Sequence, residues 1–595
     1  MITDIFDRYQ PALHGNFGIP EIMILKKGLE AKNIIEAMIG VGYREHEVQY
    51  IENYYNSSSD SVRNMQEATK HLGIGTQDKM TAAIAFLKKI AFLPSINSKY
   101  LNLRGLSDLN IPTRSANPSS VPIGKTEQAV FYAISDPNRI PELKQYIRSI
   151  PSVGDKEIIF ALTIESVIAM LYRQNFCDTL LDLKKTIKEF NGENSRPVFE
   201  SILIHSAFSR ASDIHFTALP QGGIVEVRID GVKSFVAAMN NSLYNSVQNL
   251  VMNSLGDPSF QIKTEGRLQE REIPEALKNR FEFRVEMMTE VYGKDMTIRL
   301  FDQGAETNDI ESLGFKKEDV SYLSNLVKSG SGLIVVVGPT GSGKTTTNYA
   351  LMKVIDPTRR SVQSVENPVE NKVGMWRQYQ LLHIDNMEEH EEWQEWNAGL
   401  LRNDPDVILQ GEIRNGKLLN VAIDMAVTGH LVFATLHADD AVKAVFRMKR
   451  MKDAYGEAVD IDLLSSILLA IQAQRLLARL CPVCKIPLNE KEKDETLREI
   501  EDKGLTLDEK SNYHLFKSKN GGCESCYWTG YRGRLLVYEI LKFNSNLIEV
   551  ITDPHSRIAD VEKFIPLHDS MQGKALQYVL NGDTDMEEVY RALRR

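Results

Sequence analysis

One short stretch of the chain, Gly338–Thr345, has the residue types and spacing that bind phosphate groups. It reads GPTGSGKT and matches the pattern G-x-x-x-x-G-K-[ST]. Glycines let such a loop curl tightly, so that successive backbone N–H groups converge on phosphate oxygens. Lys344 would reach the β- and γ-phosphates, and the Thr345 hydroxyl would ligate Mg²⁺. The residues predicted to contact the nucleotide here are Gly338, Pro339, Thr340, Gly341, Ser342, Gly343, Lys344, Thr345 and Thr346.

The elements around this loop are the ones that phosphate binding requires. Leu333–Val337 is a short, β-branched apolar run, which predicts a buried strand leading into the loop. A helix is expected from Thr346 onward, with the positive end of its dipole facing the phosphates. Strand, complete motif and helix follow in the required order, so the sequence predicts a nucleotide-binding protein.

Two further strands are predicted to deliver carboxylates. Val407–Leu409 leads to Glu412, which could organise Mg²⁺, and Ser361–Val365 leads to Glu366, which could polarise an attacking water. The alternatives are ordinary: Glu412 could cap the next helix, and Glu366 could be a surface acid beside a turn-forming proline. His430 and His437 flank the predicted strand Leu431–Thr435 and could sense the γ-phosphate or bridge a subunit interface, although a lone histidine is more often structural.

The second strong motif is a pair of C-x-x-C knuckles separated by 38 residues. Four thiolates suit tetrahedral Zn²⁺, and two short knuckles can close a structural site. A redox-active C-x-x-C pair is the alternative. Cys177 is interpreted as a core residue. The predicted zinc ligands are Cys481, Cys484, Cys523 and Cys526.

The bulk properties of the 595 residues bound these interpretations. The length favours about four domains. A net charge of −10 argues mildly against a general nucleic-acid binder, although a local basic groove would be compatible with it. The N-terminus has acids and no apolar core of a secretory signal, and no uncharged apolar run is long enough to span a membrane. The most apolar run, Ile461–Leu480, is predicted to be an amphipathic helix.

Taken together, the motifs resemble the type II secretion and type IV pilus assembly ATPase family. SVENPVE at 364–370 resembles the family's Asp box, LRNDPDVILQGEIR at 401–414 its Walker B segment, and GHLVFATLHADDA at 429–441 its His box. YRGR at 531–534 also fits the family. One departure is Asn367, which stands where the family usually has aspartate, so the role of that neighbouring carboxylate is in doubt.

The resemblance implies an α/β fold with a RecA-like P-loop motor domain. RASDIH at 210–215 and RIDGV at 228–232 resemble the family's PAS-like domain, which would bring arginines to the nucleotide and couple hydrolysis to domain motion. Each arginine could instead form a surface or interdomain ion pair. By motif position these arginines are Arg210, Arg228, Arg267 and Arg284. Arg228 and Arg284 are the candidates for a catalytic role, because both lie in predicted strands with alternating apolar neighbours, and Arg210 and Arg267 are predicted to bind the nucleotide.

The same resemblance implies the domain organisation. An N-terminal helical extension (1–70) resembles nothing that can be named, and a small α/β docking domain (71–185) is followed by the PAS-like domain (190–305). The motor domain (313–595) would contain the tetracysteine zinc subdomain (480–535) and the C-terminal helices (540–595). A tetracysteine insert together with a docking domain resembles the assembly and secretion branch rather than the retraction motors.

The implied function is a cytoplasmic, homo-hexameric ATPase with ATP, Mg²⁺ and Zn²⁺. It would power assembly of type IV pilin or type II pseudopilin subunits, acting on them indirectly. An inner-membrane platform protein and a docking protein would hold it peripherally at the inner membrane, and no direct nucleic-acid binding is expected. The alternatives are a nucleic-acid translocase and a non-catalytic, nucleotide-gated docking protein. Stimulation by single-stranded DNA would favour the former, and unchanged turnover in a Glu366→Gln variant the latter.

Overall fold

The computed structural model describes residues 31–593 with internal gaps. The gaps are residues 42, 58–63, 76, 94–103, 110–119, 126, 166, 169–170, 173–178, 193, 257–261, 279, 303–308, 383–388, 453–455, 457 and 509–512. The predicted core residue Cys177 lies outside the described residues.

The N-terminal part of the chain forms a helical unit followed by a small sheet. The helices pack around buried Met38, Ile51 and Ile74, and the sheet has the order β1-β4-β3-β2, with every residue of β3 buried. The elements are α2 (Ile34–Gly40), α3 (Glu45–Ser57), α4 (Met65–Leu72), α5 (Gln77–Leu87), β1 (Ala91–Phe92), β2 (Ser120–Lys125), β3 (Ala129–Ile134), α7 (Ile140–Arg148) and β4 (Glu157–Leu162).

Residues 196–302 form a six-stranded antiparallel sheet covered on one face by helices, called here the antiparallel-sheet domain. Its strand order is β7-β6-β5-β10-β9-β8. Buried and accessible residues alternate along β6, as expected for a sheet with one covered face. The elements are α10 (Arg196–Phe208), β5 (Ala211–Leu219), β6 (Gly222–Ile229), β7 (Val232–Asn240), α11 (Asn241–Leu255), β8 (Lys263–Arg267), β9 (Phe281–Glu290) and β10 (Gly293–Asp302); α9 (Thr179–Lys188) precedes them.

Residues 310–593 form the C-terminal domain, built on a seven-stranded sheet of order β13-β12-β14-β15-β11-β16-β19. The strands run parallel except β19, which is antiparallel to β16. Apolar cores lie against the sheet, one including Val335 and Ile408 and the other Ile334 and Leu409. The strands are β11 (Gly332–Val337), β12 (Val362–Glu366), β13 (Arg377–Gln380), β14 (Val407–Ile413), β15 (Leu431–Leu436), β16 (Leu468–Leu480) and β19 (Tyr531–Lys542).

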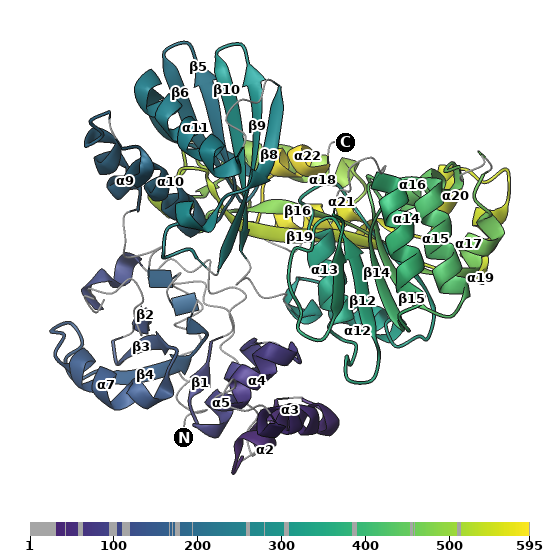
Figure 1. The fold of residues 1–595 in the computed structure, drawn as a ribbon, viewed down its shortest axis with the longest axis horizontal. Helices are drawn as coiled ribbons and strands as arrows, with labels where there is room; N and C mark the ends of the chain where they lie inside the picture. Colours follow the sequence, from purple (N-terminus) through teal and green to yellow (C-terminus); the bar gives the residue numbers. More distant parts are fainter. Residues whose placement is uncertain are drawn as a thin grey trace.

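Helices cover both faces of this sheet (Figure 1). They are α12 (Lys317–Leu326), α13 (Lys344–Met352), α14 (Glu389–Leu400), α15 (Gly416–Val427), α16 (Ala441–Lys449), α17 (Ile461–Ile467), α19 (Ser545–Thr552), α20 (Ile558–Glu562), α21 (Met571–Leu580) and α22 (Met586–Leu593). Between β16 and β19 the chain forms β17 (Ile486–Pro487), α18 (Glu490–Asp502) and β18 (Phe516–Lys517).

The prediction of one helix over Ile461–Leu480 is wrong for most of its length. Only Ile461–Ile467 is helical, and Leu468–Leu480 is a strand paired with β11 on one side and β19 on the other. The run is rich in leucine, alanine, glutamine and arginine, which favour helices. Pairing on both edges and burial of nearly every side chain override that preference.

The long pair of strands β16 and β19 connects two parts of the molecule. It extends from the parallel sheet of the C-terminal domain to a position beneath the antiparallel-sheet domain (Figure 1). The predicted fold class, a mixed α/β protein with a parallel-sheet core, is confirmed. Among the described residues, none of the helices combines the length and apolar composition that crossing a membrane requires.

The N-terminal helices touch the C-terminal domain beside the segment that joins β12 and β13. A Cβ atom built on Gly73 would lie 2.6 Å from the Gly374 backbone nitrogen, so the two backbones are in direct contact. Met375 packs against the core of the helical unit. On the same side, His46 contacts the nearly buried carboxylate of Asp356, and Arg44 pairs with that carboxylate at 3.5 Å.

Candidate nucleotide-binding site

The Gly338–Thr345 loop leaves the C-terminal end of β11 and enters α13 at Lys344. Gly338 has φ of 154° and Gly343 has φ of 88°, conformations that favour glycine. A Cβ atom on Gly338 would also lie 2.6 Å from Ser342 Oγ. The loop therefore curls as the motif predicts, with Thr340, Gly341 and Thr346 exposed at its outer surface.

Lys344 lies over this loop and donates to the carbonyl oxygens of Gly338 and Pro339, each at 3.0 Å. Burial lowers its pKa, and the carboxylates of Glu412 and Glu370 act in the opposite direction. A cation that is partly removed from water and held at a loop of backbone N–H groups is a suitable partner for phosphate oxygens.

Gln474 on β16 supports the loop from below, which sequence analysis did not predict. Its amide nitrogen donates to Ser342 O at 2.7 Å, and its amide oxygen accepts from the Thr347 hydroxyl at 2.8 Å. Gln472 donates to the same oxygen at 2.7 Å. The signal was available, because two buried amides two residues apart in an otherwise apolar run fit one face of a strand.

Glu412 lies at the end of β14, across the sheet from the loop, and accepts from two cationic or polar neighbours. His437 Nε2 is 3.1 Å from one carboxylate oxygen and Arg414 Nε is 2.9 Å from the other. Burial, followed by the nearby charge of Lys344, lowers the pKa of His437. The structure thus brings Glu412 and His437 to the edge of the sheet that carries Lys344.

The two histidines that flank β15 are placed at opposite edges of the sheet. His437 follows Leu436, which is paired with Val337 directly before the phosphate-binding loop. His430 precedes the strand, where its carbonyl accepts from Gly332 N at the start of β11. Its ring contacts the Met425 carbonyl and the Thr428 hydroxyl. The structure therefore does not bring His430 to the loop, and its predicted role at the nucleotide stays a prediction.

Glu366 ends the buried strand β12 and is held by hydrogen bonds. It is 4% exposed, and its carboxylate accepts from the Tyr349 hydroxyl at 2.8–2.9 Å and from the Ser364 hydroxyl at 2.6 Å. Burial raises its pKa against the effect of these donors. The predicted role in polarising water stays a prediction, for a carboxylate that is buried and already accepts from two hydroxyl groups.

Glu370, four residues further along the same segment, faces the loop instead. It accepts a hydrogen bond from the Thr345 hydroxyl and lies within the fields of Lys344, Arg284 and Arg299. Glu370 is an exposed residue, and the protein around its carboxyl group nevertheless removes enough water to raise its pKa. The motif had indicated a catalytic role only for Glu366, the first acid of this segment. The signal that was missed is that β12 is a buried strand. Glu366 ends this strand, whereas Glu370 lies beyond it and can reach a ligand more easily.

The arginines face this site from the antiparallel-sheet domain. Arg284 on β9 stacks over Phe301 and pairs with Glu282 at 3.1 Å. Its positive charge acts to lower the pKa of Glu370. Its direct strand neighbour on β10, Arg299, also acts on Glu370 and pairs with Asp213 at 3.1 Å. Burial lowers the pKa of Arg284. Two guanidinium groups from one domain therefore approach a carboxylate of the other.

The remaining predicted arginines have other partners. Arg228 donates to the carbonyl of Gly231 in its own hairpin at 3.1 Å, and Arg267 pairs with Glu282 at 3.2 Å. Arg210 forms an ion pair with the buried Asp230 at 2.8 Å. Their approach to the nucleotide stays a prediction. Arg210 forms its ion pair within its own domain, with a carboxylate that also contacts Gly533 and Arg534 of the C-terminal domain.

The four predicted zinc ligands come together in one cluster. Their sulfur atoms all lie within 4.8 Å of one another, with Cys481–Cys523 and Cys484–Cys526 each at 3.9 Å. Four sulfurs around a tetrahedral Zn²⁺ would be about 3.8 Å apart, from Zn–S bonds of about 2.3 Å. A hydrogen bond from Cys481 and backbone N–H groups of Cys523 and Gly530 lower the pKa of Cys526 to about 4, whereas the same hydrogen bond raises the pKa of Cys481 and burial raises that of Cys484. The donor set fits the ion.

The fold and the site together define a P-loop nucleotide-binding protein with a second domain that supplies arginines. The family model for type II/IV secretion system proteins matches residues 192–591, and the chain belongs to that family. The type II secretion system ATPase E of Vibrio cholerae is 33% identical over 389 residues, covering 64% of this chain and 72% of the relative.

Similarity to a second relative extends further along the chain. The type IV pilus assembly ATPase PilB of Myxococcus xanthus is 28% identical over 575 residues, covering 89% of this chain and 96% of the relative. The solved structure of the pilus retraction motor PilT with bound ADP is 22% identical, covers 66% of this chain and 96% of its own, and has a TM-score of 0.44. The chain is thus a member of a family of secretion and pilus-assembly ATPases.

Proposed function

We propose that this protein hydrolyses ATP to power assembly of type IV pilus subunits. The supporting observation is that Lys344, Glu370 and Arg284 converge from three elements on one phosphate-binding loop. The alignment with the pilus assembly ATPase covers 96% of that relative, against 72% for the secretion ATPase, and this favours pili over a type II pseudopilus.

In this proposal the γ-phosphate of ATP lies between the two domains. Thr345 and Glu412 would hold Mg²⁺, which would supply charge neutralisation at the phosphate oxygens. Glu370 accepts the proton of the attacking water, a role assigned to it rather than to the enclosed Glu366. Arg284, with Arg299 beside it, stabilises the charge that spreads over the γ-phosphoryl group in the transition state.

The remaining assignments complete the proposed machine. The four cysteines hold Zn²⁺ and fix the end of the β16–β19 strand pair. The protein acts as a homo-hexamer in the cytoplasm, bound to the inner membrane through a platform protein and a docking protein. Movement of the arginine-bearing domain during hydrolysis is passed to the platform protein and, through it, to the pilin.

Phosphate release from ATP by the purified protein tests the hydrolysis, and cells of the source organism test its purpose. Wild-type protein with Mg²⁺ should turn over ATP, and Lys344→Ala should lose activity by about a hundredfold or more. The same variant in cells should abolish pili. Loss of type II secretion with normal pili would contradict the choice of pilus, and stimulation of turnover by single-stranded DNA would favour a translocase.

A further inference from the structure

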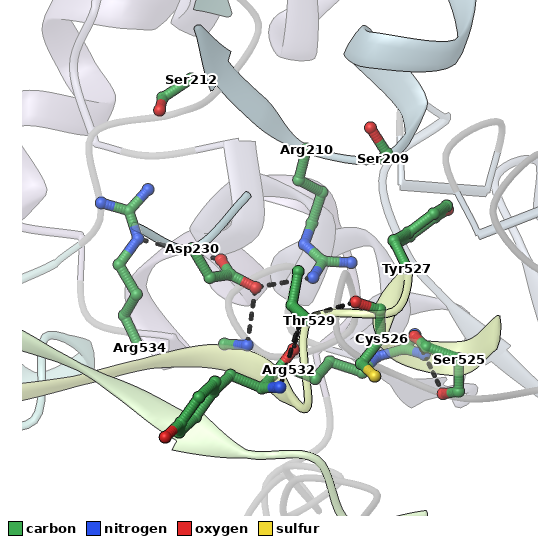
Figure 2. Close-up of polar contacts among 12 residues, drawn as sticks. Ser209, Arg210, Ser212, Asp230, Ser525, Cys526, Tyr527, Thr529, Arg532 and Arg534 are labelled. Atoms are coloured by element: carbon green, nitrogen blue, oxygen red, sulfur yellow. Dashed lines mark hydrogen bonds and ion pairs between the residues drawn. The ribbon is translucent and has the colours of Figure 1, made fainter. Parts of the chain in front are cut away.

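A second cluster of charges joins the two domains at a distance from the nucleotide. Asp230 lies in the turn between β6 and β7 and is 4% exposed. Its carboxylate pairs with Arg210 at 2.8 Å, accepts from the Gly533 backbone N–H at 2.8 Å, and lies 3.8 Å from Arg534 Nε. Figure 2 shows Asp230 between Arg210 and Arg534, above the start of β19. We call these four residues the latch.

The latch crosses the boundary between the domains. Asp230 and Arg210 belong to the antiparallel-sheet domain, whereas Gly533 and Arg534 belong to β19 of the C-terminal domain. Gly533 has φ of 95°, a conformation that favours glycine, in the stretch that presents its N–H to Asp230. Arg210 also has a positive φ of 65°, at the position after helix α10 where glycine is usual.

Further polar and aromatic contacts between the two domains surround the latch. The Ser234 hydroxyl donates to the carbonyl of Tyr527 at 2.9 Å, and the Tyr527 ring packs edge-on against His205 with centroids 6.0 Å apart. Arg532 is nearly buried and donates to Ser525 through two bonds of 2.6 Å (Figure 2). Burial, and next the nearby charge of Arg210, lowers the pKa of Arg532 to about 10. Three guanidinium groups thus gather around the single carboxylate of Asp230.

The antiparallel sheet connects the latch to the nucleotide. Six residues from six neighbouring strands form one row across it: Arg267, Arg284, Arg299, Asp213, Arg228 and Lys233. Asp230 follows Arg228 by two residues, and Arg284 lies three strands away, about 14 Å at the usual strand spacing. A sheet paired along this whole row resists distortion, so a displacement at one end of the row is transmitted to the other end.

A second connection runs through the C-terminal domain to the phosphate-binding loop. Arg534 is paired with Ala478 on β16, and Gln474, which holds Ser342 and Thr347, lies four residues before it on that strand. That separation is about 14 Å along a strand. The latch therefore lies where two hydrogen-bonded connections meet. The antiparallel sheet leads from it to the arginines, and strand β16 leads from it to the phosphate-binding loop.

We infer that Asp230 is a positioning residue, which holds the antiparallel-sheet domain on β19 so that Arg284 faces the bound nucleotide. The inference rests on the proposed ATP hydrolysis. Loss of the carboxylate charge leaves three guanidinium groups close together with a buried N–H, which favours separation of the domains at this point. The arginine then moves away from the γ-phosphate, although the phosphate-binding loop itself is unchanged.

The first measurement is hydrogen–deuterium exchange on the full-length, zinc-loaded protein. Asp230→Asn should raise exchange about tenfold in peptides from 229–234 and 527–536, and should abolish the protection that Mg-ADP gives residues 281–286 in the wild type. Glu272→Gln is the matched control, because Glu272 is 5% exposed and pairs with Arg196 inside the same domain. It should leave exchange at both segments unchanged.

The second measurement is ATP turnover, which separates positioning from folding. In Asp230→Asn, kcat should fall about 10- to 100-fold while KM for ATP stays within about twofold. In a double-mutant cycle with Arg284→Ala, the second substitution should add little, because both act through the same guanidinium group. Independent effects that simply add would overturn the inference.

A second variant covers the case in which Asp230→Asn does not fold. Arg534→Ala removes only the interdomain ion pair of a partly exposed side chain and should reproduce the exchange changes and the fall in kcat. Normal exchange and normal kcat in Arg534→Ala and Asp230→Asn would overturn the latch. If the wild type has no turnover, the proposed function fails, and the exchange measurements with Mg-ADP still support or overturn the latch independently.

Discussion

The antiparallel-sheet domain contacts the C-terminal domain through two clusters of charge that behave in opposite ways. At the latch, burial alone would raise the pKa of Asp230, but Arg210, Arg534 and the Gly533 N–H hold that pKa below its usual value. At the nucleotide edge, removal from water prevails: the pKa of Glu370 is raised and the pKa values of Lys344 and Arg284 are lowered.

This difference distinguishes charged groups that are paired within the protein from charged groups whose partners are a bound substrate and metal ion. The latch supplies its carboxylate with fixed partners, so the ionised form is the stable one in the folded protein. At the nucleotide edge, the charges of Glu370, Lys344 and Arg284 do not fully offset one another. Such an arrangement is expected where an anionic substrate and a metal ion bind. The comparison can be tested by changing one group at a time on each side.

The largest expected effect distinguishes the two glutamates of the 364–370 segment. Glu370→Gln should lower kcat about 100- to 1,000-fold, because the amide cannot accept a proton from water. Glu366→Gln should keep turnover within about tenfold, since that carboxylate is enclosed by Tyr349 and Ser364. Phosphate-release kinetics on both variants decides between them, and a larger loss in Glu366→Gln would restore the assignment made from the sequence.

Arg284→Ala comes next and tests the nucleotide edge from the other domain. We expect kcat to fall about a hundredfold, with a smaller loss for Arg299→Ala because its side chain is more exposed and pairs with Asp213. Binding of a fluorescent ATP analogue should change little in either variant. Arg267→Ala is the control, and an equal loss there would show that the whole row, rather than Arg284, serves the site.

Removal of the metal should affect the latch more than the nucleotide edge. The segment that follows Cys526 carries Tyr527 and leads into the first residues of β19, which include Gly533 and Arg534. Chelation should therefore loosen this segment and lower kcat about tenfold while the nucleotide still binds. Metal analysis, exchange at residues 527–536 and analogue binding on the same sample check this. Unaltered exchange after complete loss of zinc would separate the cysteine cluster from the latch.

The pH dependence of turnover gives a smaller, directional effect. Because the pKa of Glu370 is raised above 4.5, protonation should abolish its role as a base at a higher pH than for a free glutamate, and kcat should fall as pH drops through that raised value. Arg284 acts to lower this pKa, so the acid limb of the kcat profile should move to higher pH in Arg284→Ala. A limb that stays in place would place Arg284 outside the field of Glu370.

The smallest effect is expected where the N-terminal helices meet the C-terminal domain. His46→Ala removes a contact to Asp356 at a partly exposed position, and should lower the stability of the folded chain by about 1 kcal/mol or less. Thermal unfolding measures it, with His555→Ala as an exposed control. A larger loss would mean that these helices are an integral part of the catalytic unit.

The sequence predicted the parts of the site that depend on local spacing and missed those that depend on pairing. The phosphate-binding loop, Glu412 and each of the two C-x-x-C knuckles follow from motifs whose geometry is set within a few residues. Glu370 and Gln474 depend on which strand is buried and which strands are neighbours, information that enters only with the sheet. The strand β16 was mistaken for a helix for the same reason, because its residues prefer helix until partners flank them.

The arginines show a further limit of sequence reasoning. Motif position treated Arg210 and Arg284 alike, yet one is joined to Asp230 and the other faces Glu370. Both follow from sheet register and from the contact between domains, which no local pattern contains. Ion pairs that hold a domain in place and ion pairs that await substrate have the same residue types, and only their surroundings distinguish them.

The position of the four cysteines at one end of the β16–β19 strand pair has a consequence for the order of folding. Cys481 directly follows β16, and Cys526 precedes β19 by a few residues, so the strands are separated in sequence by a long insertion. Bringing such distant segments together costs chain entropy, and a bound ion between the knuckles shortens the loop that must close. If zinc binds before β19 pairs with β16, this edge strand of the central sheet would be added to a chain already closed by the metal, and the rate of folding would depend on the supply of zinc.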